Sequence, residues 1–170
     1  MKVKLLRVDD QVEVEAMILK SQLFKGNLPS ITDEWRFNFK KNTKKYGCQT
    51  FVLITEDFYT RAEGCLIFEM KAKVEPYMAY IEIAPHNKGN KRIYQRVAEC
   101  LIAFACRLSF IYGEAHYKGW LAFDVLEIKK ENQIKLMALY SKKYNALKFG
   151  ENTMIISPED GENLINTYLN

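Results

Sequence analysis

A basic loop in the middle of the chain has the clearest chemical character. Residues 84–96 follow an apolar run and contain four lysines and arginines but no carboxylate: Lys88, Lys91, Arg92 and Arg96. A predicted helix begins at the end of this stretch, and the unpaired N–H groups of a helix N-terminus attract anions. The loop therefore predicts a phosphate or pyrophosphate site rather than a metal site. An exposed loop in a basic protein would have the same composition, so both interpretations stay open.

Hydrophobic periodicity predicts the elements that position this loop. Their expected order is strand, two helices, three strands, helix, strand, helix, strand, helix. Pro85 ends a strand over 77–83, a long helix over 94–112 follows, and a strand over 120–126 completes a βαβ unit. The other predicted strands are 2–8, 49–55, 63–70 and 154–156, and the other predicted helices begin near residues 9, 32, 134 and 158.

Composition limits the classes of protein to consider. With 48% hydrophobic and 27% charged residues among 170, disordered and fibrous classes are excluded, and one domain over residues 1–170 is expected. The net charge of +4 (25 − 21) is only a weak basic excess. Apolar runs are too short to span a bilayer and no signal-peptide core follows the first residues, so we expect a cytoplasmic protein without membrane contact.

Nucleophile and metal motifs are missing from the sequence. The four cysteines, Cys48, Cys65, Cys100 and Cys106, form no CxxC pair and have no histidine at zinc-finger spacing. We expect buried, reduced thiols and no metal ion. The sequence also contains no G-x-S-x-G, H-E-x-x-H or G-x-x-x-x-G-K-[ST] motif.

The element order and the basic loop together resemble the Gcn5-related N-acetyltransferase (GNAT) superfamily over nearly the whole chain. In that family a strand ending V-x-P leads into an R-G-x-G-x-G/A loop and a helix, and Ile83-Ala84-Pro85 matches the strand end. Allowing a longer loop, Arg96-Val97-Ala98 takes the place of G-x-G/A. The resemblance implies an α/β, layered α+β fold in which helices flank a mixed, mostly antiparallel central sheet.

The same resemblance implies an acyl donor, acetyl-CoA or a related acyl-CoA, whose pyrophosphate is held by loop amides. Arg96 stands where the family has a glycine, a residue that lets the backbone approach phosphates closely. Arg96 either folds outward and adds a charged contact or weakens cofactor binding. The implied cofactor-binding residues are Ile83, Lys91, Arg92, Gln95, Arg96, Val97, Ala98 and Gln133.

Two catalytic roles, general acid and general base, have candidate residues. Tyr140 lies in the sequence L-Y-S-K-K-Y-N-A, which resembles the family's L-Y-x-x-x-G-F context, with Asn145 in place of glycine and one residue more between them. The resemblance implies that this tyrosine protonates the departing CoA thiolate, although a tyrosine at this position could also simply pack on a helix face. Glu82, the carboxylate within strand 77–83, is the candidate general base, with His86 as a second candidate.

We therefore expect an enzyme that transfers an acetyl group directly to an amine of a small molecule or peptide. A catalytically degenerate acyl-CoA-binding module is the alternative, consistent with Arg96 and Asn145 at glycine positions. A third, less favoured interpretation is nucleic-acid binding by the run of Lys40, Lys41, Lys44 and Lys45, because such a run is more often a solvated face. The sequence leaves the oligomeric state open, and homodimers are the commonest homo-oligomers.

Overall fold

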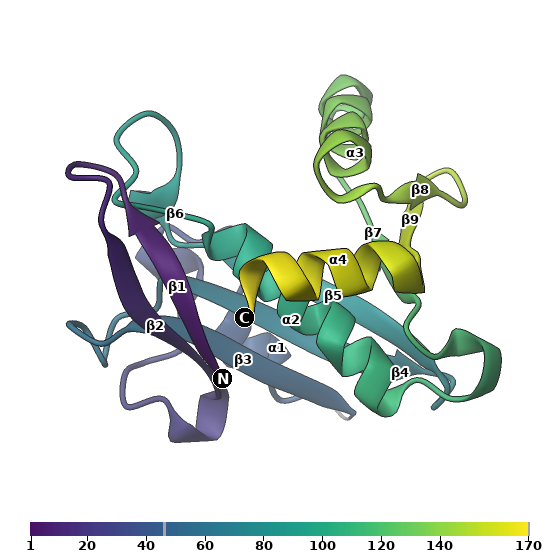
Figure 1. Ribbon diagram of the computed structural model, residues 1–170, viewed down its shortest axis with the longest axis horizontal. Helices are drawn as coiled ribbons and strands as arrows, with labels where there is room; N and C mark the ends of the chain where they lie inside the picture. Colours follow the sequence, from purple (N-terminus) through teal and green to yellow (C-terminus); the bar gives the residue numbers. More distant parts are fainter. Residues whose placement is uncertain (46, 170) are drawn as a thin grey trace.

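A nine-stranded sheet runs through the computed structural model, which describes residues 1–45 and 47–169 (Figure 1). The strand order is β6-β1-β2-β3-β4-β5-β7-β9-β8, and among the described strands only β5 and β7 pair in parallel. The strands are β1 (Lys2–Arg7), β2 (Glu13–Lys20), β3 (Cys48–Thr55), β4 (Gly64–Lys71), β5 (Glu75–Ile83), β6 (Tyr94–Gln95), β7 (Leu121–Asp124), β8 (Leu147–Lys148) and β9 (Thr153–Ile156). The predicted mixed, mostly antiparallel sheet is confirmed.

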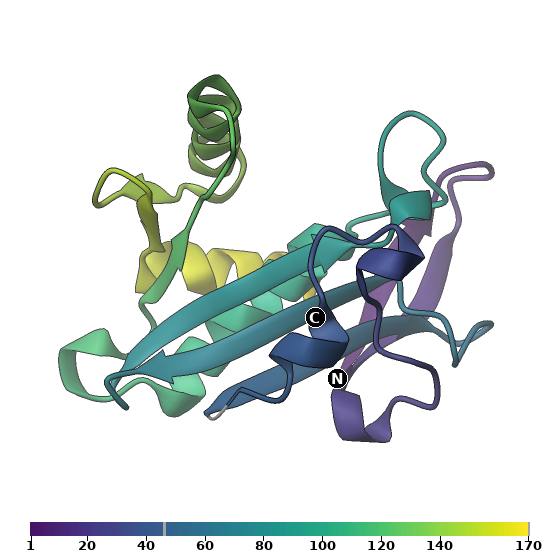
Figure 2. The same cartoon turned by 180° about the vertical axis from the view of Figure 1, so that it is seen from behind.

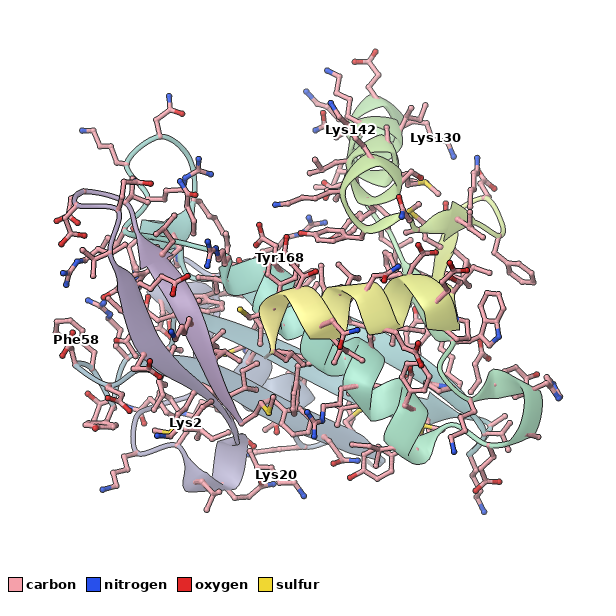
Figure 3. The ribbon with its side chains drawn as sticks, in the orientation of Figure 1. Lys2, Lys20, Phe58, Lys130, Lys142 and Tyr168 are labelled. Atoms are coloured by element: carbon pink, nitrogen blue, oxygen red, sulfur yellow. The ribbon has the colours of Figure 1, made fainter. Side chains whose placement is uncertain are left out.

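Helices cover both faces of this sheet. They are α1 (Phe39–Asn42), α2 (Val97–Tyr112), α3 (Lys130–Tyr144) and α4 (Pro158–Tyr168). On one face α2 lies between the sheet and α4, which explains why its residues from Cys100 to Cys106 are all buried. The last turn of α4, marked by Tyr168 in Figure 3, lies over the start of α2, where the Cys100 thiol contacts the Tyr168 carbonyl at 3.7 Å. Figure 2 shows α1 and the loops beside it on the other face.

The predicted helix that begins near residue 9 is wrong, because this segment forms β2 and a hairpin with β1. Asp9 and Asp10 do not cap a helix; they make the hairpin turn, in which Asp10 Oδ1 accepts the N–H of Val12 at 3.2 Å. Both faces of β2 are covered, with Ile18 in one core and Leu19 packed against the other. The first half of β2 alternates exposed glutamates with apolar residues, but the second half, Ala16 to Leu19, is apolar throughout and therefore does not distinguish a strand from a helix.

The predicted helix that begins at residue 32 is also wrong. Ser30 caps a single 3₁₀ turn over Ile31–Asp33, and the turn ends at Glu34, whose φ is 65°. The backbone N–H groups of Arg36 and Phe37, shortly after this turn, donate to a carboxylate on β5 instead of continuing a helix. The apolar spacing of this segment reflects burial of its aromatic side chains against the sheet, not helical periodicity.

The remaining predicted elements are present, including the βαβ unit formed by β5, α2 and β7. The long helix begins at Val97 and not at Tyr94, because Tyr94 and Gln95 pair with β1 as β6. Gly64 at the start of β4 permits α2 to approach the sheet, because a Cβ there would lie 2.8 Å from side-chain atoms of both Val97 and Leu101. No helix among the described residues is long and apolar enough to cross a membrane. The three cysteines other than Cys48 are buried free thiols, and Cys48 is a half-buried free thiol.

Candidate active site

The site lies where β5 and β7 separate. The two strands are paired at Tyr77 and Ala122, and β7 then turns away toward α3 (Figures 1 and 2). A bulge accompanies this separation: Ile67 and Phe68 on β4 pair with Tyr80 and Met78, so that Ala79 is the additional residue on β5. Bulges bend a strand and increase its twist. Beyond the bulge, β5 therefore has an edge toward which β7 provides no partner.

A groove of about 370 Å³ follows this edge. We call it the α2–α3 groove. Its lining residues are Ile81, Glu82, Ile83 and Lys88 from β5 and the following loop, Ala98 and Ile102 from α2, Leu136, Leu139, Tyr140, Lys143 and Tyr144 from α3, together with Arg36 and Phe37. The lining is mostly apolar, with a few polar groups, as expected for a small-molecule site.

Tyr140 lines this groove and also a smaller cavity between β5 and β7. Its ring packs against Phe123 at a centroid distance of 5.1 Å and against Tyr144 at 5.7 Å. Burial raises the pKa of Tyr140, and the nearby charge of Glu127 raises it further. Among the described residues its hydroxyl has no hydrogen-bond partner. A protonated phenol with a free O–H can donate a proton to a group bound in the groove.

Glu82 lines the same groove, so the structure brings the two candidate catalytic residues together. Its carboxylate is buried and accepts three hydrogen bonds: from the backbone N–H of Arg36 at 2.9 Å, the backbone N–H of Phe37 at 3.0 Å and Lys88 Nζ at 2.6 Å. Each oxygen thus already has a partner. In this arrangement Glu82 anchors the segment that carries Arg36 and Phe37.

The start of α2 has the backbone expected of a glycine position. Arg96 is the N-cap and has a φ of 70°, in the left-handed region that favours glycine. Its side chain points outward, where Nη1 donates to Glu13 on β2 at 2.8 Å. The side chain thus makes no cap bond to the helix. The first N–H groups of α2 are left for another acceptor.

The other predicted cofactor residues are distributed around this helix start. Ile83 and Ala98 line the groove, whereas Val97 is buried in the core beside it. Lys91 and Arg92 lie exposed in the loop before α2, and Gln95 belongs to β6, paired with β1. Gln133 is not in the lining set, because its amide donates to Asn152 Oδ1 at 2.7 Å and holds the turn between β8 and β9.

Sequence reasoning missed Arg36, which spans the separated strands. Its backbone is fixed to Glu82, while its guanidinium contacts Glu127 at 2.5 Å and the Leu126 carbonyl at 2.7 Å, both just after β7. The adjacent aromatic residue Phe37 was the available signal. The apolar spacing of the segment predicts a helix, and a helix would not place Arg36 across the groove.

A polar cluster around Glu63 was also missed. This fully buried carboxylate contacts His86 Nε2 at 2.6 Å, accepts from Arg61 Nε at 2.8 Å and from Asn87 Nδ2 at 2.8 Å. Asn87 in turn accepts the N–H of Tyr94 at 3.0 Å. The cluster therefore fastens both ends of the loop that leads into α2. In the described part of the chain, no group of three His, Cys, Asp or Glu side chains is placed to hold a metal ion.

Two separating strands beside a helix N-terminus, in a mixed and mostly antiparallel sheet flanked by helices, define the GNAT fold. Structural comparison agrees. A structure of the KacTA–DNA complex aligns with a TM-score of 0.63 at 14% identity over 89% of this chain and 99% of that chain. A mutant of the toxin AtaT, bound to the C-terminus of the antitoxin AtaR and to acetyl-CoA, has a TM-score of 0.55 at 14% identity, covering 88% and 97%.

A chimera of the spermidine N-acetyltransferase SpeG from Vibrio cholerae and hSSAT has a TM-score of 0.50 at 17% identity, covering 74% of this chain and 77% of that chain. No family model and no curated protein matches the sequence. The predicted resemblance to the GNAT superfamily is thus confirmed for the fold, and at these identities the likeness is one of fold alone.

Proposed function

We propose that this protein transfers an acetyl group from acetyl-CoA, or the acyl group of a related acyl-CoA, directly to an amine. The observation that carries the proposal is the position of Tyr140, whose free hydroxyl lines the same groove as the unpaired edge of β5. The neighbours named as acetyltransferase or as bound to acetyl-CoA support it. We also propose that the protein is located in the cytoplasm.

The chain offers suitable contacts along an acyl-CoA. Backbone groups on the unpaired edge of β5, near Ile81 and Ile83, can pair with the amides of the extended pantetheine arm as an added strand would. The N–H groups at the start of α2 suit the pyrophosphate. Lys143, which now pairs with Glu99 in the first turn of α2, stands in the groove lining as a further cation for a phosphate.

The proposed reaction needs positioning and one proton donor. The amine nitrogen attacks the thioester carbonyl carbon, a C–N bond forms and the C–S bond breaks. The departing sulfur takes the proton of the Tyr140 hydroxyl, and the proton lost by the amine passes to a base or to water. Glu82 remains the proposed base, although its present hydrogen bonds first have to rearrange. Tyr140 then recovers its proton from solvent.

The alternative is an acyl-CoA-binding module, which would have the same fold but would not catalyse acyl transfer. Arg96 at a glycine-like backbone position favours it, because an arginine there adds bulk beside the helix start. Nucleic-acid binding is a separate interpretation. The KacTA neighbour was solved with DNA, and Lys40 and Lys41 of α1 are exposed in this chain. For the present chain we favour an amine acceptor of small-molecule or peptide type.

Two measurements test the proposal. Acetyl-CoA at about 100 times its Kd should stabilise the protein by about 2.7 kcal/mol, seen as a raised unfolding midpoint. Tyr140→Phe should retain that shift and lower the rate of free-thiol release with mixed amines by about 100-fold or more. Tyr59→Phe, at an exposed tyrosine, is the matched control. No shift at any concentration would refute both acyl-CoA interpretations, and equal rates would remove Tyr140 from the general-acid role.

A further inference from the structure

We propose that the acceptor is recognised as a cation, and that its ammonium or guanidinium group takes the place that Arg36 occupies beside Glu127. The proposal rests on the acyltransferase function above and names the chemical class of its acceptor. The structure then represents a closed arrangement in which an internal guanidinium fills the acceptor position.

Three hollows meet at Arg36 and Phe37, which line all of them. The first is the α2–α3 groove. The second, an inner cavity of about 100 Å³, continues past Tyr140 between β5 and β7. The third, an outer cavity of about 330 Å³, opens beside Lys45 and Tyr80 on the α1 side of the sheet. Arg36 thus lines the outer cavity as well as both spaces that Tyr140 lines.

The partners of the Arg36 guanidinium form a cation-binding set. They are the Glu127 carboxylate at 2.5 Å and the Leu126 carbonyl oxygen at 2.7 Å. The Glu127 side chain is only 18% exposed, so removal of Arg36 would leave a largely buried carboxylate without its cation. The Arg36 side chain is 48% exposed and has room to turn outward. Arg36, Glu127 and Tyr140 line the inner cavity together, so the pair lies close to the proposed general acid.

The Glu127 carboxylate and the Leu126 carbonyl oxygen can accept the N–H groups of an alkylammonium or guanidinium ion. An alkylamine has a pKa near that of lysine, about 10.4, and therefore arrives as a cation at neutral pH. Its nitrogen passes one proton to Glu82 or to water before it attacks the thioester, and it loses a second proton as the amide forms. The inner cavity also has aromatic walls, Phe37, Tyr80 and Phe123, whose ring faces favour a cation. The outer cavity is lined by Lys45, Lys71 and Arg36 and by the carboxylates of Glu69 and Asp124, so two acids there counter the two lysines once Arg36 has turned away.

Cation rescue tests this inference without relying on turnover. Arg36→Ala should be stabilised by methylguanidinium or n-butylammonium, with a midpoint about 3 to 6 °C higher at ten times the Kd of the probe. The wild type, whose site is filled, should show no such shift. Arg36→Ala should also show no shift when n-butanol, which has no charge, or sodium chloride of equal ionic strength replaces the organic cation. The double variant Arg36→Ala with Glu127→Gln should lose the shift.

Matched controls are Arg7→Ala, which breaks a remote pair with Asp10, and Glu151→Gln, which breaks the exposed pair with Lys130. The Arg7→Ala variant should gain no shift, and Glu151→Gln added to Arg36→Ala should keep it. If Arg36→Ala does not fold, Arg36→Met preserves the aliphatic stem for the same measurement. If neither folds, Glu127→Gln in the otherwise wild-type chain should raise the KM for n-butylamine at least tenfold, whereas Glu151→Gln should leave that KM unchanged.

The outcome separates this inference from the proposed function. A folded Arg36 variant that gains no stability from either cation overturns the cationic acceptor site, even if acetyl-CoA binds. An unchanged KM in Glu127→Gln overturns it as well. Failure of acetyl-CoA to stabilise the wild type instead refutes the acyl-CoA function, whatever the cations do.

Discussion

The Glu82 carboxylate on β5 accepts the backbone N–H of Phe37 at 3.0 Å, across 45 positions of sequence. The same carboxylate accepts the N–H of Arg36 at 2.9 Å. One buried acid thus fixes the path of an irregular segment and thereby places the Arg36 guanidinium across the separated strands. Any catalytic use of Glu82 is tied to the position of this segment.

The first prediction concerns that anchor. Glu82→Gln has one acceptor oxygen instead of two, so one N–H of the segment is left without its acceptor and Lys88 loses its charged partner. We expect the free energy of unfolding in urea to fall by about 1 to 3 kcal/mol. Glu56→Gln, at an exposed position, should change it by less than about 0.5 kcal/mol. Equal stability of the two variants would show that the anchor contributes nothing.

A second prediction follows from the φ of 70° at Arg96. Arg96→Val places a β-branched residue in the left-handed region and should lower the free energy of unfolding by about 1 to 2 kcal/mol. Arg96→Gly should be nearly neutral, because relief of strain is offset by chain entropy and by the lost exposed pair with Glu13. We also expect Arg96→Gly to bind acetyl-CoA at least as tightly as the wild type. Arg92→Val is the loop control, and a loss there equal to that of Arg96→Val would contradict the strain argument.

The third prediction concerns the Glu63 cluster. Glu63→Ala leaves His86, Arg61 and Asn87 without their shared acceptor and should cost about 3 to 5 kcal/mol of stability. The milder change Asn87→Ala frees the N–H of Tyr94 and loosens the loop before α2. If this loop holds the acyl-CoA phosphates, calorimetry should show weaker acetyl-CoA binding by Asn87→Ala. Asn90→Ala, in the exposed middle of the loop, should bind acetyl-CoA like the wild type. Unchanged affinity in both variants would separate the cluster from cofactor binding.

The fourth prediction is a loss of stability in alkali. Burial raises the pKa of Cys100 and of Cys106 to about 12, whereas an unfolded thiol has a pKa of about 8.5. Because the folded state keeps protons that the unfolded state releases, stability is fully present below about pH 8.5 and falls as pH rises toward 12. Each thiol contributes a slope of about 1.4 kcal/mol per pH unit.

Urea unfolding between pH 8 and 10.5 measures this slope. Cys106→Ala should reduce it by the contribution of one group, whereas Ser109→Ala, a non-titrating change on the same helix, should leave it unchanged. If Cys106→Ala has the wild-type slope, the thiol does not titrate differently in the two states.

Much of the fold was predictable because its signals are local. The apolar run that ends at Pro85 and the long apolar stripe of α2 indicate the βαβ unit. Tyr140 and Glu82 were identifiable as candidates by residue type and by family resemblance, and both line the α2–α3 groove. Their chemical roles remain predictions.

The sequence by itself determined which residues have chemistry to offer and where the βαβ unit begins and ends, since periodicity and proline act over a few residues. Only the tertiary structure decided that residues 13–20 are a strand, because the alternation of apolar residues with Glu13 and Glu15 stops at the apolar run from Ala16 to Leu19, which a helix could also bury. It also decided that Arg36 meets Glu127 beside Tyr140. That meeting depends on contacts between segments 91 positions apart, which no local pattern encodes.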